Sequence, residues 1–174
     1  MANPRRKPNR LPAISYIGRK SYFLTLCLSE RRRLFARSRL TGAITDVLKQ
    51  TCEAHYFGLY AYCFIPDHLH LLLCGMTDIA DLSAMVRTFK GRAAAAARRL
   101  GYADFWQKGF YDRVIRSGEE FENAAAYVLM NPVRAGLVQD FAEWPHSGSS
   151  MLDWRNIAPP QPDYQPPWKR SGAG

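Results

Sequence analysis

The sequence has few cysteines, no long hydrophobic run and almost no acidic residues near its N-terminus. Cys27, Cys52, Cys63 and Cys74 are widely spaced within apolar stretches, which indicates reduced core residues rather than a zinc site or a disulfide framework. No apolar run approaches the roughly 18 residues that a membrane span requires, and the N-terminus lacks the apolar core of a signal peptide. We therefore expect a soluble, cytoplasmic protein.

The scarcity of acidic residues is confined to one part of the chain. The whole sequence has 24 Lys and Arg against 15 Asp and Glu, a net charge of +9. Residues 1–39 contain 11 of the basic residues and a single acid, Glu30, so this segment has a net charge of +10 and the remainder −1. A strong positive charge favours an acidic polymer as partner. A solvated basic tail explains the run "RRKPNR" equally well.

The length of 174 residues, with 47% hydrophobic residues, is sufficient for one domain with a substantial core. We expect a basic N-terminal arm at 1–20, one folded domain at 21–147 and a proline-rich C-terminal tail at 148–174.

Hydrophobic periodicity predicts the elements of this domain. In chain order they are a strand at 21–29, a helix at 41–55, strands at 56–65 and 68–74, a helix at 78–100, a strand at 110–116 and a helix from 117 to 131, where Pro132 should end it. This order predicts an α+β, ferredoxin-like fold with an antiparallel sheet and helices packed mainly on one face.

Two histidines interrupt the apolar run "FIPDHLHLLL". Because side chains alternate across a strand, His68 and His70 share one face with residues 72 and 74. The leucines at 69, 71 and 73 fill the other face, which is the expected core. Two imidazoles about 7 Å apart along a strand are able to turn toward one divalent ion. Histidines that only face solvent or form hydrogen bonds would give the same pattern.

A second candidate group lies in "EEFENAAAYVLMNPVRAGLV". On a helix, Tyr127 and Asn131 are spaced i and i+4 and therefore point to the same side. Such a pair could supply a nucleophile and a metal ligand. Tyr127 is also compatible with a filler at the edge of the core, and Asn131 with a helix terminator before proline.

Together these segments resemble a known family. His68-Leu69-His70 is similar to the motif of the HUH endonucleases, and Tyr127 with Asn131 occupies the place of their single tyrosine and its downstream metal ligand. The segments "YFLTLCLSERRRLF", "FIPDHLHLLL", "FWQKGFYDRVIR" and "YVLMNPVRAGLV" resemble the REP-associated tyrosine transposases over residues 15 to 147. Insertion-sequence members usually have glutamine where this chain has the shorter Asn131.

The resemblance implies an HUH fold and an enzyme that cleaves and rejoins single-stranded, hairpin-forming DNA through a 5′-phosphotyrosine. Tyr127 would be the nucleophile, and His68, His70 and Asn131 would hold Mg²⁺ or Mn²⁺. Such a protein would associate with the nucleoid. The expected DNA-binding residues are basic: Arg5, Arg6, Lys7, Arg10, Arg31, Arg32, Arg33, Arg87, Lys90, Arg92, Arg113 and Arg116.

Two other functions remain compatible with the residues. A non-catalytic DNA-binding protein would keep the basic surfaces without needing the histidines and tyrosine to meet. A metal-dependent nuclease using activated water would use the histidines but have no need of Tyr127.

Overall fold

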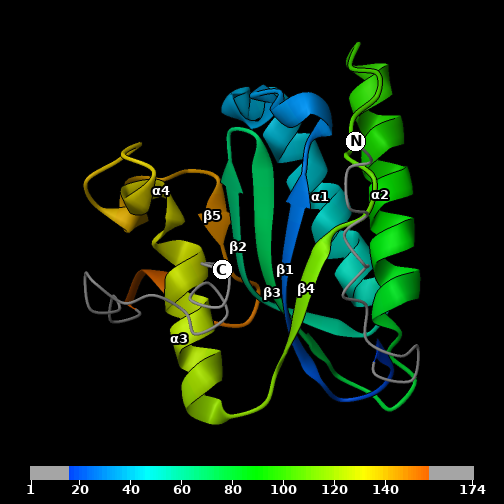
Figure 1. Cartoon of the computed structure of the whole chain (residues 1–174), viewed down its shortest axis with the longest axis vertical. Helices are drawn as coiled ribbons and strands as arrows, with labels where there is room; N and C mark the ends of the chain where they lie inside the picture. The colour runs from blue at the N-terminus through cyan, green and yellow to red at the C-terminus, as the bar shows by residue number, and fades with distance from the viewer. Residues whose placement is uncertain (1–15, 157–174) are drawn as a thin grey trace, which may run out of the picture.

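The computed structural model describes residues 16–156, except for the side chain of Glu119. Its centre is a five-stranded antiparallel sheet in the order β4-β1-β3-β2-β5. The strands are β1 (Ser21–Cys27), β2 (Phe57–Ile65), β3 (His68–Gly75), β4 (Tyr111–Ile115) and β5 (Ser147–Gly148). The helices are α1 (Ser38–Ala54), α2 (Leu82–Arg99), α3 (Gly118–Leu129) and α4 (Asn131–Arg134) (Figure 1). The predicted α+β fold with an antiparallel sheet is confirmed.

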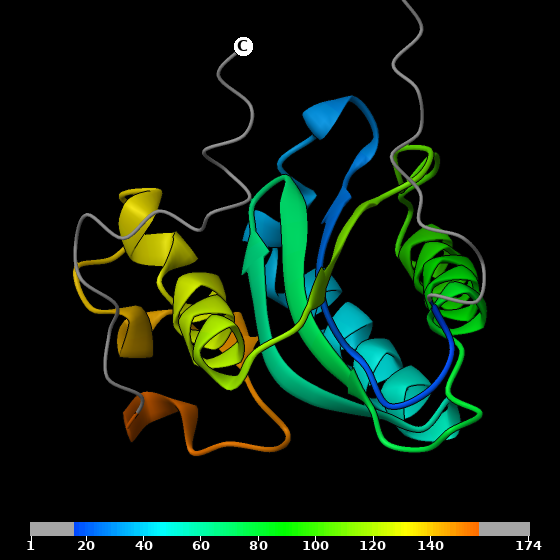
Figure 2. The same ribbon diagram turned by 60° about the horizontal axis from the view of Figure 1, so that its bottom comes forward.

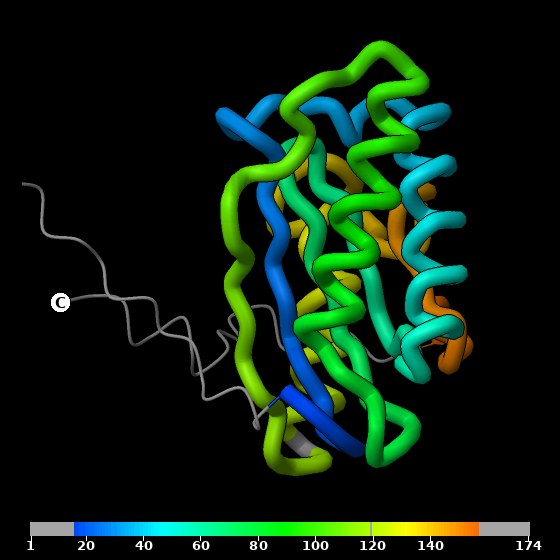
Figure 3. Tube along the Cα trace, turned by 90° about the vertical axis from the view of Figure 1, so that its right-hand side faces the viewer, coloured from blue at the N-terminus to red at the C-terminus, as the bar shows by residue number. Residues whose placement is uncertain are grey.

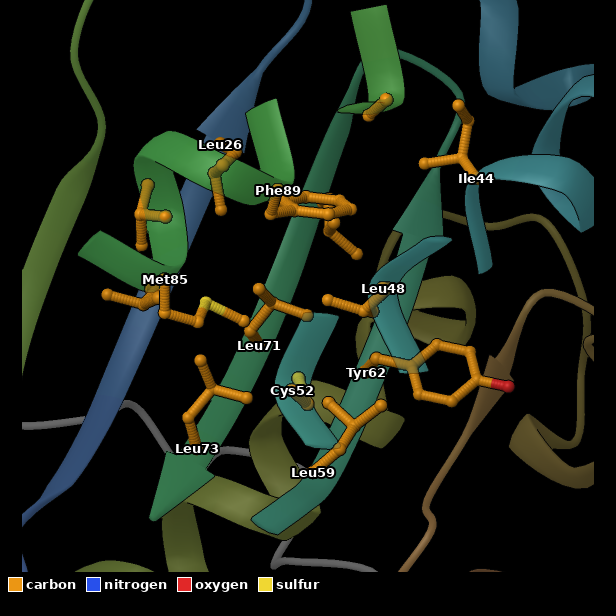
Figure 4. Packing of buried hydrophobic residues seen from close by; sticks show 14 of the residues in the cluster. Leu26, Ile44, Leu48, Cys52, Leu59, Tyr62, Leu71, Leu73, Met85 and Phe89 are labelled. Carbon is orange, nitrogen blue, oxygen red and sulfur yellow. The ribbon is translucent and has the colours of Figure 1, made fainter. Parts of the chain in front are cut away.

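The two longest helices, α1 and α2, pack side by side on one face of the sheet, as expected (Figure 3). The leucines of β3 at 69, 71 and 73 point to this face and are fully buried. They pack with Leu48 of α1 and with Met85 and Phe89 of α2 (Figure 4). The strict alternation of β3 thus forms this core, and the apolar faces of both helices close it.

The opposite face of the sheet is also covered, because α3 packs against β2 and β3 (Figure 2). A second core there joins Phe23 and Leu72 of the sheet to Ala124 and Val128 of α3. This face contains the histidines, and His70 is only 3% exposed. The sequence indicated the leucine face as the core and left the histidine face open, whereas the protein has a core on each side.

A β-bulge changes the pattern of β2. The pairing with β3 shifts between Leu59 and Ala61, so that Tyr60 packs in the α3 core and Tyr62 in the α1–α2 core. An unbroken strand would place Tyr60, Tyr62 and Phe64 on one face. Tyr60 instead points to the opposite face, because a bulged residue breaks the two-residue alternation.

The segment around Pro132 also differs from the prediction. Ser117 caps α3 by accepting a hydrogen bond from the Glu120 backbone N–H, and α3 ends at Leu129. Asn131, however, is not pushed out of helical structure. It begins the short helix α4, in which Pro132 occupies the first turn, a position where proline has no hydrogen bond to lose.

The folded unit is longer than the predicted 21–147. Tyr16 is buried in the α1–α2 core, and Ile17 forms a bridge with Asp81. At the other end, Gly148 pairs with Tyr62, and Trp154 is buried in the core under α3. The short segment that follows β5 thus belongs to the domain rather than to the tail. Between residues 16 and 156, no helix is long and apolar enough to cross a membrane.

Candidate active site

The two histidines of β3 face each other at the second core. Their Nε2 atoms are 3.0 Å apart, and the ring centroids are 4.6 Å apart. The strand places both side chains on one face, and the short separation of the Nε2 atoms shows that both rings turn toward a common point. Two imidazole nitrogens that converge in this way are suited to bind one ion.

The outward nitrogen of each ring has its own partner. Nδ1 of His68 lies 2.6 Å from Oδ1 of Asp67, and Nδ1 of His70 lies 2.9 Å from Oγ1 of Thr25. Metal-binding histidines usually have such a partner on the far nitrogen, because it fixes the ring and its tautomer. The histidine pair therefore has an outer layer of the kind found around metal sites.

Tyr127 of α3 lies beside this pair. Its ring centroid is 6.2 Å from that of His70 and 5.9 Å from that of Phe23. The guanidinium of Arg134, in α4, lies over the ring at 4.7 Å from its centroid. The tyrosine is only 1% exposed, because the sheet covers it on one side and neighbouring aromatic and arginine side chains cover its ring.

Asn131 lies one turn beyond Tyr127. Its Nδ2 donates hydrogen bonds to the carbonyl oxygens of Tyr127 at 2.8 Å and Val128 at 3.3 Å. These are carbonyls at the C-terminal end of α3, which have no partner within an ideal helix end. The side-chain amide nitrogen thus caps α3, and these bonds do not use Oδ1.

A second tyrosine is also near the histidines. Thr25 pairs with His70 on one side and with Tyr111 on the other, so the three side chains form a row on one face of the sheet. Tyr111 is 47% exposed, and its ring lies 6.3 Å from that of Phe23. Partial burial raises the pKa of its phenol. Tyr111 thus lies on the histidine face, with one strand between it and His70.

The predicted DNA-binding arginines divide into two groups. Arg31 is part of the site, since its Nη1 lies 3.4 Å from Oδ2 of Asp67. Arg113 lies on the histidine face of the sheet and pairs with Glu120 at 3.1 Å. The exposed side chain of Arg33 is close by in the chain, and exposed Arg116 directly follows β4.

Arg32 and the basic residues of α2 are placed differently from Arg31 and Arg113. Helix α2, with Arg87, Lys90 and Arg92, packs on the opposite face of the sheet. Lys90 donates to the carbonyl oxygens of Gln107 and Gly109, and Arg92 donates to Gln50. Arg32 donates to the carbonyl oxygens of Ala103 and Asp104. Arg32, Lys90 and Arg92 therefore have structural partners. Arg5, Arg6, Lys7 and Arg10 lie outside the described residues.

Within residues 16–156, no three side chains from His, Cys, Asp and Glu form a group able to hold a metal ion. A metal here would thus have two imidazoles and would need an oxygen from another side chain, from water or from substrate. The donor set of two nitrogens and one amide oxygen fits Mn²⁺, and Mg²⁺ less well, because Mg²⁺ prefers oxygen ligands.

Comparisons with known proteins show the family of the chain. The family model described as "Transposase IS200 like" matches residues 18–131, a span that includes the histidine pair, Tyr127 and Asn131. The chain belongs to this family. Its resemblance to the REP-associated tyrosine transposases is confirmed by the similar proteins.

A protein of Haemophilus influenzae named "Putative REP-associated tyrosine transposase" is 31% identical over 140 residues, 72% of this chain and 77% of that protein. The REP-associated tyrosine transposase of Escherichia coli is 27% identical over 147 residues, 80% of this chain and 87% of that protein. A solved structure, described as a REP-associated tyrosine transposase bound to a REP hairpin, has a TM-score of 0.67 at 24% identity, covering 84% and 82% of the two chains. That similarity supports the fold.

Three neighbours of the site were not predicted from sequence. Asp67 adjoins His68 in the chain, so the sequence alone could have indicated it as a partner for that ring. Thr25 is on another strand, and its contact with His70 depends on the pairing register of β1 with β3. Arg134 is seven residues after Tyr127, which is two turns of a continuous helix. Because the helix was predicted to end at Pro132, helical spacing was not used to relate these two residues.

Proposed function

We propose that this chain is a metal-dependent strand transferase that cleaves and rejoins single-stranded DNA through Tyr127. The observation that carries the proposal is the position of the Tyr127 ring, 6.2 Å from the ring of His70, beside two histidine Nε2 atoms that converge to 3.0 Å. A tyrosine next to a two-imidazole metal site combines a nucleophile with a group that polarises phosphate.

The ion would be held by His68, His70 and Oδ1 of Asn131. When bound, it would polarise the scissile phosphate and stabilise the charge of the transition state. Asp67 and Thr25 keep the two rings directed at this point. Asn131 fixes its own oxygen relative to Tyr127, because its amide nitrogen donates a hydrogen bond to the carbonyl oxygen of Tyr127.

Tyr127 supplies the covalent step. Its hydroxyl oxygen bonds to phosphorus while the bond from phosphorus to the 3′ oxygen breaks, so the phenol loses a proton and the leaving 3′ oxygen gains one. The product is a 5′-phosphotyrosine with a free 3′-hydroxyl, and attack by another 3′-hydroxyl reverses the step. Because Tyr127 is 1% exposed, its neighbours must shift for a phosphate to reach it.

The proposed substrate is an oligonucleotide that forms a hairpin beside a single-stranded segment. The similar solved structure, described as bound to a REP hairpin, supports the hairpin. The basic segment after β1 lies against the β2–β3 turn that precedes the histidines, since the Phe35 N–H donates to the carbonyl oxygen of Pro66 in that turn. Arg31 and Arg33 are therefore placed to contact backbone phosphates near the site. Such a substrate locates the protein at the nucleoid.

The test compares two tyrosine variants on a hairpin-forming oligonucleotide in Mn²⁺, analysed on a denaturing gel. With a 3′ label, the wild-type protein should give a covalent protein–DNA band; with a 5′ label, it should give a free shorter strand. Tyr127→Phe removes one oxygen and almost no volume, so it should bind DNA and form neither product. Tyr111→Phe is the matched control and should form both.

Peptide mapping of the trapped adduct should find the nucleotide on the peptide that contains Tyr127. An adduct on Tyr111, or an undiminished adduct in Tyr127→Phe, contradicts the assignment. Cleavage to free strands with no covalent band at any time would instead identify a nuclease that uses water. Binding without any cleavage would identify a DNA-binding protein.

A further inference from the structure

Asp67 is the most firmly held acidic residue next to the histidine pair. It lies in the β2–β3 turn, and its carbonyl oxygen accepts a hydrogen bond from the Leu28 N–H at 2.9 Å. The preceding carbonyl, of Pro66, accepts from the Phe35 N–H at the same distance. Two backbone bonds thus attach this turn to the segment that follows β1, so the Asp67 side chain starts from a fixed position.

Both oxygens of the Asp67 carboxylate have partners. Oδ1 is 2.6 Å from Nδ1 of His68, and Oδ2 is 3.4 Å from Nη1 of Arg31. Arg31 is itself directed by a second contact, from Nη1 to Sγ of Cys27 at 3.1 Å. The guanidinium on one oxygen therefore leaves the other oxygen directed at His68.

The chemistry of this contact decides which nitrogen of His68 carries hydrogen. An ionised carboxylate only accepts hydrogen bonds, so Nδ1 of His68 must donate. In the neutral ring Nε2 then has the lone pair, and this is the atom that faces His70 at 3.0 Å. Thr25 acts differently on His70, because a hydroxyl both donates and accepts and is compatible with either tautomer.

We propose that Asp67, supported by Arg31, is a positioning residue that keeps His68 in the tautomer able to bind the metal. The metal part of this inference rests on the function proposed above, whereas the tautomer is a property of the metal-free protein. Thr25 is compatible with both tautomers of His70, so His70 is able to change tautomer when the ion binds. Asp67 therefore fixes the tautomer of His68 before the ion binds, whereas that of His70 can still change.

The first experiment measures the tautomer without metal or DNA. Two-bond ¹H–¹⁵N NMR spectra of the full chain at about pH 8, with chelator present, distinguish a protonated Nδ1 from a protonated Nε2 in each histidine. Wild-type His68 should have hydrogen on Nδ1. Asp67→Ala should lose this preference, and Asp67→Asn, which retains an acceptor oxygen, should recover part of it. A His68 ring with hydrogen on Nε2 in the wild-type protein overturns the proposal.

The second experiment measures Mn²⁺ affinity directly, by electron paramagnetic resonance of free Mn²⁺. Asp67→Ala should raise the dissociation constant by about 10- to 100-fold, the usual effect of removing the partner of a metal-binding histidine. Asp78→Ala is the charge-matched control, since Asp78 is exposed and pairs with Arg19, and it should leave the affinity unchanged. Arg31→Gln should weaken Mn²⁺ binding more than Arg33→Gln, which removes the same charge nearby.

The outcomes separate this proposal from the function it rests on. Wild-type protein that takes up no Mn²⁺, with or without DNA, overturns the metal site, while the NMR spectra still decide whether Asp67 sets the tautomer. If wild-type protein binds Mn²⁺ and Asp67→Ala binds it equally well, Asp67 has no positioning role. Thermal unfolding of each variant, measured alongside, shows whether any decrease in affinity reflects unfolding.

Discussion

His68 and His70 are neighbours on β3, but single substitutions at the two positions should affect the protein differently. The side chain of His68 is 20% exposed, whereas His70 is 3% exposed and packs against Phe23 and Tyr127. Removing the ring of His70 leaves a cavity in the second core, and removing that of His68 mainly opens the surface.

We predict that His68→Ala and His70→Ala both abolish cleavage and leave DNA affinity within a few-fold of wild type, because phosphate contacts dominate binding. His70→Ala should also lower the free energy of unfolding, by roughly 1–3 kcal/mol. Denaturant unfolding and a DNA titration, performed before the cleavage assay, separate the two effects. A variant that cleaves at the wild-type rate in Mg²⁺ or Mn²⁺ would show that the metal site is elsewhere.

The sequence predicts those parts of the site whose residues are close together along the chain, and not the contacts between distant segments. The pair of histidines is visible within one strand. Tyr127 and Asn131 are four residues apart in one predicted helix, although the structure divides this segment into α3 and α4. Predicting the contact of His70 with Thr25 requires the pairing register of β1 with β3, because the two residues are 45 positions apart in the sequence. The approach of Tyr127 to His70 requires knowing that α3 packs on the histidine face, which no local pattern contains.

Among the secondary-structure elements, regular patterns were predicted and interruptions were not. The alternating leucines of β3 predicted its bounds closely. In β2 the bulge at Tyr60 reverses the side-chain direction. The local sign of it in "YFGLYAYCFI" is Gly58, because glycine is disfavoured within strands and often marks a bulge. At Pro132 a rule about proline put the end of the helix at residue 131, two residues beyond Leu129, and missed that proline also occupies the first turn of the next helix.

The end of β3 provides a test of packing between elements. A Cβ added at Gly75 would overlap the carbonyl oxygen of Gly18 and press on Ala80. The Gly75 N–H also donates to the carbonyl oxygen of Lys20, so the two backbones cannot separate without breaking this bond. Only glycine allows the segment that enters β1 to pass so close to β3.

We predict that Gly75→Ala lowers the free energy of unfolding by about 1–3 kcal/mol, the usual cost of overpacking. Gly91→Ala is the matched control, because Gly91 is in the middle of α2 with nothing within 4 Å of the added methyl group. That substitution should raise the free energy of unfolding by about 0.5–1 kcal/mol. Both values come from denaturant unfolding, and equal effects at the two positions would contradict the close approach at Gly75.

Across the whole molecule, charge and the candidate site occupy overlapping regions. Residues 1–39 have a net charge of +10, and the part of this segment around Arg31 lies beside the histidine pair. The face covered by α1 and α2 has basic residues too, but Lys90 and Arg92 are bonded to neighbouring protein groups. The histidine end of the sheet is therefore where DNA should be concentrated.

We predict that the basic arm at 1–20 contributes to DNA binding through its charge. Deleting residues 1–10 removes Arg5, Arg6, Lys7 and Arg10 and should weaken binding to single-stranded DNA. The slope of the logarithm of the binding constant against the logarithm of the salt concentration should become shallower by about 0.7 for each phosphate that the arm neutralises. A full-length variant with these four residues replaced by Gln should match the deletion, because the effect is one of charge. Fluorescence anisotropy at several salt concentrations gives both slopes. Equal slopes for the wild-type and truncated chains would show that the arm does not bind DNA, and would leave Arg31 and Arg33 as the basic residues to test next.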